Sequence, residues 1–194
     1  MRIYLAILAL LVVSGTSVYA QEVNIGIKGG LNAYTVGGDD TEDAEIKLGY
    51  NLGLLGHVHI SDRFGIQPEI VYSTQGTKGN ESGADLKVNL DYINVPVLFQ
   101  YMYDNGFRLQ AGPQVGFLTS AKVKGDGISV DIKDDIKSID FALSVGASYV
   151  HPPSGFGIDA RYNYGISNIN EDDSSKAFNR GFQVGVFYLF KHKS

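Results

Sequence analysis

The stretch that decides the fold is "FQVGVFYLF", residues Phe182–Phe190, which lies directly before a short charged tail. Large apolar side chains occupy every second position, whereas Gln183 and Gly185 stand between them. Successive side chains of a β-strand point to opposite faces, so this strand has one apolar face that must be covered. The rest of the chain determines what covers it.

Seven further segments repeat the same alternation, and no helical apolar stripe follows the first 20 residues. Their apolar positions are Val23, Ile25, Ile27, Leu31; Leu48, Tyr50, Leu52, Leu54, Val58, Ile60; Phe64, Ile66, Ile70, Tyr72; Ile93, Val95, Val97, Phe99, Tyr101; Phe107, Leu109, Ala111, Val115, Phe117; Ile139, Phe141, Leu143, Val145, Ala147, Tyr149; and Phe156, Ile158, Ala160, Tyr162, Tyr164, Ile166. We therefore expect an all-β chain with eight strands.

The intervening positions are polar or glycine, and the chain contains 24 glycines. The polar positions are Asn24, Lys28, Asn32, Asn51, Gln67, Glu69, Asn94, Gln100, Arg108, Gln110, Gln114, Asp140, Ser144, Asp159, Arg161 and Asn163. Each expected strand therefore has one apolar and one polar face.

The connections between the strands alternate in length. Four are long and charged, at residues 35–47, 74–87, 121–135 and 168–177, and the other three are short turns at 61–63, 104–106 and 151–155. In an antiparallel up-and-down sheet, alternate connections emerge at opposite ends. This asymmetry is typical of outer-membrane barrels, which have short periplasmic turns and longer extracellular loops.

Two eight-stranded barrels fit this pattern. A soluble lipocalin-like carrier would line its interior with the apolar face, whereas a membrane barrel turns that face to lipid. The polar face favours the membrane barrel, because its glycines leave room for charged side chains of both signs inside a narrow lumen. The charged residues are Lys28, Glu69, Arg108, Asp140, Asp159 and Arg161.

Aromatic residues of the apolar face support the same choice, because girdles of aromatic side chains mark both membrane interfaces of such barrels. Toward the short turns lie Phe64, Tyr101, Tyr103, Phe107, Tyr149, Phe156, Tyr188 and Phe190, and Tyr50, Tyr72, Phe117, Phe141 and Tyr164 are expected at the other interface. The fold class expected is therefore all-β, an eight-stranded antiparallel up-and-down transmembrane barrel with four long loops at one end and three short turns at the other.

The first 20 residues read as a secretory signal peptide, with Arg2, an apolar run and a small-residue finish at Ala20. We expect residues 1–20 to be cleaved and residues 21–194 to form one outer-membrane barrel domain. The cleaved chain would carry about six net negative charges, which argues against nucleic acid as a partner. The chain has no cysteine, so neither a lipid-anchored cysteine nor a disulfide is expected.

Four segments resemble the PorT-like outer membrane β-barrel domain family of Bacteroidetes. They are "GIQPEIVYSTQG" at 65–76, "DYINVPVLFQYMY" at 91–103, "AGPQVGFLTSAK" at 111–122 and "DARYNYGISNI" at 159–169. The resemblance implies an eight-stranded barrel related in architecture to OmpA and OmpX, and PorT itself belongs to a secretion machinery. The closing strand also resembles the C-terminal signal that barrel assembly machinery reads. In that signal the aromatic residue is terminal, whereas here "KHKS" follows it.

Pro68, Pro96 and Pro113 fall inside expected strands, where each removes a ladder donor. The resembling family segments carry proline at these places too. We expect local bulges or bends there.

Few residues form a candidate site. His57 and His59 share a strand face near Glu69 and have the spacing of a metal-chelating pair, but a place in the lumen's hydrogen-bond network is favoured. The six lumen charges read either as an ion pathway or, preferably, as a structural plug. Solvated loop charge is favoured over calcium binding for Asp39, Asp40, Glu42, Asp43 and Glu45, and the glycosylation-like "NES" at 80–82 carries little weight.

No nucleophile and base occur at a recognisable spacing, and the four histidines lie toward the short turns or the tail. We predict a non-enzymatic barrel with a structural or surface-interaction role through its long loops, and we predict no catalytic, cofactor-binding or metal residue. The expected partners are outer-membrane lipid, the barrel assembly machinery through the C-terminal strand, and an extracellular or secretion partner. The alternatives are a secretion-apparatus component, a lipid-modifying enzyme and a soluble lipocalin-like carrier.

Overall fold

The computed structural model describes residues 23–38, 44–81, 84–125, 127–172 and 175–190. Eight strands form the barrel wall: β1 (Val23–Gly38), β2 (Glu45–His59), β3 (Phe64–Glu81), β4 (Ala84–Met102), β5 (Phe107–Gly125), β7 (Ile139–Val150), β8 (Phe156–Gly165) and β9 (Ala177–Leu189). A short strand, β6 (Ile128–Asp131), and a 3-10 turn, η1 (Lys133–Asp135), lie between β5 and β7. No helix within these residues is long and apolar enough to cross a membrane.

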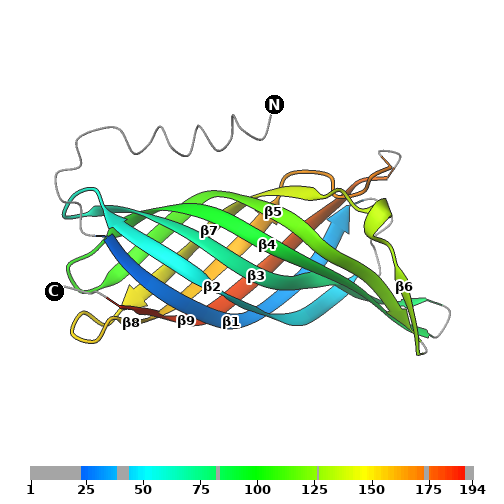
Figure 1. Cartoon of the computed structure of the whole chain (residues 1–194), viewed down its shortest axis with the longest axis horizontal. Coiled ribbons are helices and arrows are strands. Elements are labelled where there is room, and N and C mark those ends of the chain that lie inside the picture. Colours follow the sequence, from blue (N-terminus) through cyan, green and yellow to red (C-terminus); the bar gives the residue numbers. More distant parts are fainter. Residues whose placement is uncertain (1–22, 39–43, 82–83, 126, 173–174, 191–194) are drawn as a thin grey trace.

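The wall is a closed antiparallel cylinder (Figure 1). Consecutive wall strands pair with each other, and the first pairs with the last, from Gly26 opposite Leu189 to Gly38 opposite Ala177. Closure leaves no free edge, which is the condition for a sheet to cross a lipid layer. The expected eight-stranded up-and-down barrel is confirmed.

The three short turns lie at one end, and the connections expected to be long lie at the other (Figure 1). Much of the expected loop sequence is strand, however. β3 and β4 run to the tip of their hairpin with Glu81 opposite Ala84, and β5 continues to Gly125 and pairs with β6. The described residues between Gly165 and Ala177 are mainly irregular. The strands at this end are therefore longer than expected, because charged residues that were expected in loops continue the strands.

The apolar face points outward. Leu54, Val145 and Val184 are each more than half exposed, whereas Glu69 and Arg161 of the opposite face are 2% and 3% exposed. A soluble carrier requires the reverse arrangement, with its apolar residues around a central cavity. The lipocalin-like alternative is therefore wrong, and the outer surface is an apolar band suited to lipid.

Aromatic side chains bound this band as expected. At the short-turn end the ring centroids of Phe64, Tyr101, Tyr103 and Phe107 follow one another at 5.0–5.7 Å. At the other end the Tyr50 and Tyr72 centroids are 6.1 Å apart. From Phe107 to Phe117 along β5, a rise of about 3.4 Å per residue and a tilt of about 40° give roughly 25 Å, the height of an outer-membrane apolar band.

The prolines do not create bulges. The β3–β4 register is the same at Pro68 as at Val71, and the β4–β5 register is unchanged beyond Pro96. Pro113 lies in an uninterrupted register with β7. The expectation of bulges at these positions is wrong. The register shifts instead lie between Ile46 and Asn51 on β2 and between Asp91 and Tyr92 on β4, both toward the long-connection end.

This placement of the band predicts a position-dependent cost of charge. Val145 lies outward near mid-band, so Val145→Arg is expected to lower the free energy of unfolding in lipid vesicles by about 2–4 kcal/mol. Ile128 is also exposed but lies in β6, beyond the band, so Ile128→Arg should change the free energy of unfolding by less than about 0.5 kcal/mol. Denaturant titration measures both, and equal losses would contradict the assigned band.

Candidate functional site

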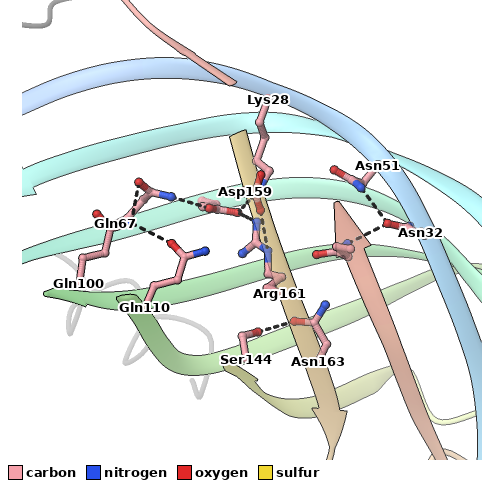
Figure 2. Close-up of polar contacts among 12 residues, drawn as sticks. Lys28, Asn32, Asn51, Gln67, Gln100, Gln110, Ser144, Asp159, Arg161 and Asn163 are labelled. Carbon is pink, nitrogen blue, oxygen red and sulfur yellow. Dashed lines mark hydrogen bonds and ion pairs between the residues drawn. The ribbon is translucent and has the colours of Figure 1, made fainter. Parts of the chain in front are cut away.

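The lumen is the first candidate site, because it collects the polar face of every wall strand. All sixteen polar positions expected on that face, from Asn24 to Asn163, are buried. Figure 2 shows side chains of this set directed toward one another from strands on different sides of the barrel. The filled interior is that of a plug rather than a channel, since eight strands enclose only enough room for side chains.

Four of the six predicted lumen charges form one ion-pair network. Lys28 Nζ lies 3.3 Å from Glu69 Oε2 and 3.3 Å from Asp159 Oδ2. Arg161 Nη2 lies 2.7 Å from Glu69 Oε2, and its Nε lies 3.4 Å from Asp159 Oδ2. The four residues carry two charges of each sign, so the network is neutral although it is buried. It joins β1, β3 and β8 across the lumen.

The other two predicted charges lie outside this network. Arg108 Nη1 lies 3.4 Å from His57 Nδ1 and donates to Gln100 Oε1 at 3.5 Å, nearer the short turns. Asp140 accepts hydrogen bonds from Ser167 Oγ at 2.7 Å and Asn179 Nδ2 at 2.9 Å, toward the other end. Four of the six lumen charges therefore pair with one another, and the other two have neutral polar partners or a histidine.

Amides extend the network along the barrel. Gln67 Nε2 donates to Glu69 Oε1 at 2.8 Å, and Gln100 Nε2 donates to Gln67 Oε1 at 3.1 Å and to Gln110 Oε1 at 2.9 Å (Figure 2). Asn32 forms a second centre and accepts from Asn51 Nδ2 at 2.7 Å. These bonds give partners to most of the polar atoms named here, which would be costly to bury alone, although Gln110 Nε2 has no hydrogen-bond partner among the described residues.

Apolar side chains close the lumen at both ends, a feature that sequence reasoning missed. Leu55, Val150, Phe187 and Leu189 cluster at the short-turn end. At the opposite end the buried cluster consists of Val36, Leu90, Tyr92, Leu118, Ala121, Ile136, Ile169 and Ala177. The polar network is therefore held between two apolar caps.

One sequence signal marks the second cap. The apolar positions Leu90 and Tyr92 are even-numbered, whereas the lipid-facing run that follows, from Ile93 to Tyr101, is odd-numbered. Because even-numbered and odd-numbered side chains of β4 point to opposite faces, this switch from even to odd apolar positions means that the apolar side chains point inward above the membrane band and outward within it.

The two candidate metal ligands lie at the short-turn end of the lumen. His57 is buried, and its ring lies edge-on to that of His59, with centroids 4.5 Å apart. The Arg108 guanidinium lies against His57, and Glu69 is held by Lys28 and Arg161. Among the described residues no group of three or more histidine or acidic side chains could hold a metal ion. His57 therefore has a polar partner in the lumen, whereas the buried Nδ1 of His59 has no hydrogen-bond partner among the described residues.

The candidate sites on the connections are only partly visible. Asp39, Asp40, Glu42 and Asp43 lie outside the described residues, and Glu45 is an exposed residue at the start of β2. Of the stretch 80–82, Asn80 and Glu81 end β3, and Ser82 lies outside the described residues.

A serine–histidine contact lies in the tight turn between β7 and β8. His151 Nδ1 lies 3.1 Å from Ser154 Oγ, which also accepts from the Phe156 backbone at 3.2 Å. Both residues are exposed. The contact caps the turn. It lies at the short-turn end of the barrel, opposite to the end that carries β6.

The second candidate site is the extension of β3, β4 and β5 beyond the apolar band, with β6 at its edge (Figure 1). All four residues of β6 are exposed, including the apolar Ile128 and Val130 at 67% and 54%. Among the described strands β6 pairs with β5 alone, so its outer edge has no strand partner there. This end of the molecule therefore offers surface for recognition.

Together the lipid-facing band, the plugged lumen and the one-sided extension define a small transmembrane barrel of the outer-membrane class. The chain belongs to the outer membrane protein beta-barrel domain family, whose pattern matches residues 19–171. Membership of this family places the protein in the outer membrane.

Solved structures share the fold. Neisserial surface protein A is 16% identical with a TM-score of 0.60, over 87% of this chain and 99% of its own. Ail of Yersinia pestis is 21% identical with a TM-score of 0.54 over the same shares, and its complex with the heparin analogue sucrose octasulfate gives 20% and 0.53. No curated protein matches the sequence.

The neutral ion-pair network predicts a specific pattern of stability loss. Glu69→Gln leaves Lys28 and Arg161 with Asp159 alone, so we expect the free energy of unfolding to fall by about 3 kcal/mol. Lys28→Gln added to this variant restores neutrality and should recover part of the loss. Denaturant unfolding of the two single variants and the double variant measures the coupling. Additive losses would show that the network does not act as a unit.

Proposed function

We propose that this protein is a non-enzymatic barrel that interacts with a partner at the cell surface through the extension of β3–β6. The observation that supports the proposal is the difference between the barrel interior and the end that carries β6. The lumen is filled and has an apolar cluster at each end, whereas the exposed strand edge and the exposed side chains of Ile128 and Val130 lie beyond the lipid-facing band. Binding by such a surface uses strand addition at a free edge, for which Ile128 and Val130 offer apolar side-chain contacts.

An enzymatic role has less support. The described histidines lie in the lumen or at the short turns, away from the extension, and the Ser154–His151 contact caps a turn. Lipid-modifying chemistry needs a nucleophile and a base at the membrane surface, within reach of each other. The extension supplies lysine, serine and carboxylate side chains without such a pair among its described contacts.

A role in secretion, as in PorT, is the second candidate. It is supported by the four family-like segments at 65–76, 91–103, 111–122 and 159–169. These segments lie mostly in the wall, so this role predicts contacts at the short-turn end or along the wall rather than at β6. Export by signal-peptide cleavage after Ala20 and insertion by the assembly machinery through the β9 strand are parts of the same proposal.

Cysteine accessibility tests the arrangement, because the natural chain contains no cysteine. We expect Ser129→Cys in β6 to react with a membrane-impermeant maleimide on intact cells. Asp104→Cys in an exposed short turn is the matched control and should react only after the outer membrane is permeabilised. The reverse labelling pattern would overturn the proposed orientation.

The same two variants separate the two candidate roles. A cleavable crosslinker attached at Ser129→Cys should give a discrete crosslinked product on intact cells, and Ile128→Ser with Val130→Ser should weaken it. Ile46→Ser, an exposed apolar change outside β6, should leave it unchanged. A product formed from Asp104→Cys alone would favour the secretion role.

A further inference from the structure

A hollow on the extension collects positive charge just above the apolar band. Its volume is about 620 Å³, and five lysines line it together with one carboxylate. These residues are Lys47, Lys78, Lys87, Lys122, Lys124 and Asp91. The chain as a whole is acidic, so this concentration of lysine is local.

The strand register places three of these lysines in one row. Lys78 is opposite Lys87 in the β3–β4 pair, and Lys87 is opposite Lys124 in the β4–β5 pair. Like charges directly opposite each other destabilise a sheet. Burial lowers the pKa of Lys47, the charge of Asp91 raises it, and the charges of Lys124 and Lys78 lower it further. The Lys47 Nζ donates to the Gln75 carbonyl oxygen at 2.8 Å.

The described carboxylates are too few to offset the charge of the lysines. Asp91 lies within the hollow, Glu45 is opposite Lys78 and Asp131 is opposite Lys122. None of the five lysines forms an ion pair with a carboxylate within the part of the chain that the structure describes. The hollow therefore keeps an excess of positive charge that an external anion would relieve.

The lower wall of the hollow shows what kind of anion fits. Tyr50 and Tyr72 belong to the interfacial girdle, and Leu48 beside them is 73% exposed. The rim formed by Leu48, Tyr50 and Tyr72 is therefore continuous with the lipid-facing band, and the opposite rim, formed by the lysines, is cationic. A ligand that matches both rims has acyl chains and an anionic headgroup. Lysines near a membrane surface attract such headgroups.

We propose that this hollow binds the phosphate-bearing headgroup of a lipid in the leaflet at the loop end, with the acyl chains lying along the band beside Leu48. Lys78, Lys87 and Lys124 contact the phosphate oxygens, and Lys122 with Asn89 lies in the next row of the sheet toward the membrane. Asp91 is placed to accept hydrogen bonds from headgroup hydroxyls. The site adds lipid recognition to the surface role proposed above and stands independently of it.

Native mass spectrometry of the purified barrel in neutral detergent tests the proposal, with diphosphoryl lipid A and its dephosphorylated form as probes. Each lysine near an anionic surface is worth a several-fold change in affinity, so the phosphorylated lipid should bind at least about tenfold more tightly. This comparison needs no variant. Equal binding of the two lipids would overturn the proposal.

A double variant locates the site. Lys87→Gln with Lys124→Gln should weaken binding of diphosphoryl lipid A about tenfold or more. Lys137→Gln with Lys176→Gln removes the same charge at the same end of the barrel, outside the hollow, and should bind like the wild type. Unaltered binding by the first pair, or equal weakening by both, would overturn the assignment.

Thermal unfolding and competition distinguish lipid binding from a structural role of the lysines and from binding of a soluble polyanion. Without anionic lipid the Lys87 and Lys124 variant should unfold at the same or a higher temperature, since it loses like-charge repulsion; a lower temperature would indicate a structural role instead. Inorganic phosphate and heparin serve as competitors. If heparin binds through these lysines while diphosphoryl lipid A does not, the site recognises a soluble polyanion, and the lipid assignment is wrong.

Discussion

The structure depends on one constraint: a backbone that crosses lipid must pair every amide and carbonyl within itself. The chain meets it by returning β9 to β1, so that the last strand hydrogen-bonds along the first. Once the sheet is closed, the two-residue period leaves only two places for side chains, the lipid and the lumen. Outward leucines and valines and inward asparagines, glutamines and ion pairs follow from that single geometric condition.

The sequence predicted this part well, because the period is visible residue by residue. No outward position proposed from "FQVGVFYLF" backward is buried, and every inward polar residue from Asn24 to Asn163 is. The strand ends were harder to predict, since charged residues such as Lys78 and Lys87 occur in a wall that continues beyond the membrane into water. In these segments the alternation of side chains indicates a strand and the charge indicates a loop, and the structure agrees with the alternation.

Contacts among side chains were predicted less completely than their placement. The pairing of Lys28, Glu69, Asp159 and Arg161 depends on which strands face each other across the lumen, a relation that spacing within one strand does not contain. The caps were missed for a related reason. Leu90 and Ile136 are far apart in sequence and join one cluster only in the folded chain. The lysine row likewise needs the register of three strands, which only the folded sheet supplies.

Two lumen glycines face aromatic rings directly across the sheet. Gly157 is opposite Phe187 and Gly181 is opposite Tyr34, and in each case a Cβ on the glycine would fall within the partner's ring. Each ring therefore occupies the space that a side chain at the opposite position would fill if that residue were not glycine. Natural variation at these places should then be inherited in couples, with a larger residue at 157 accompanied by a smaller one at 187. On this basis a substitution inside the barrel should require a matching change on the neighbouring strand, whereas an apolar exchange on the lipid-facing surface should require none.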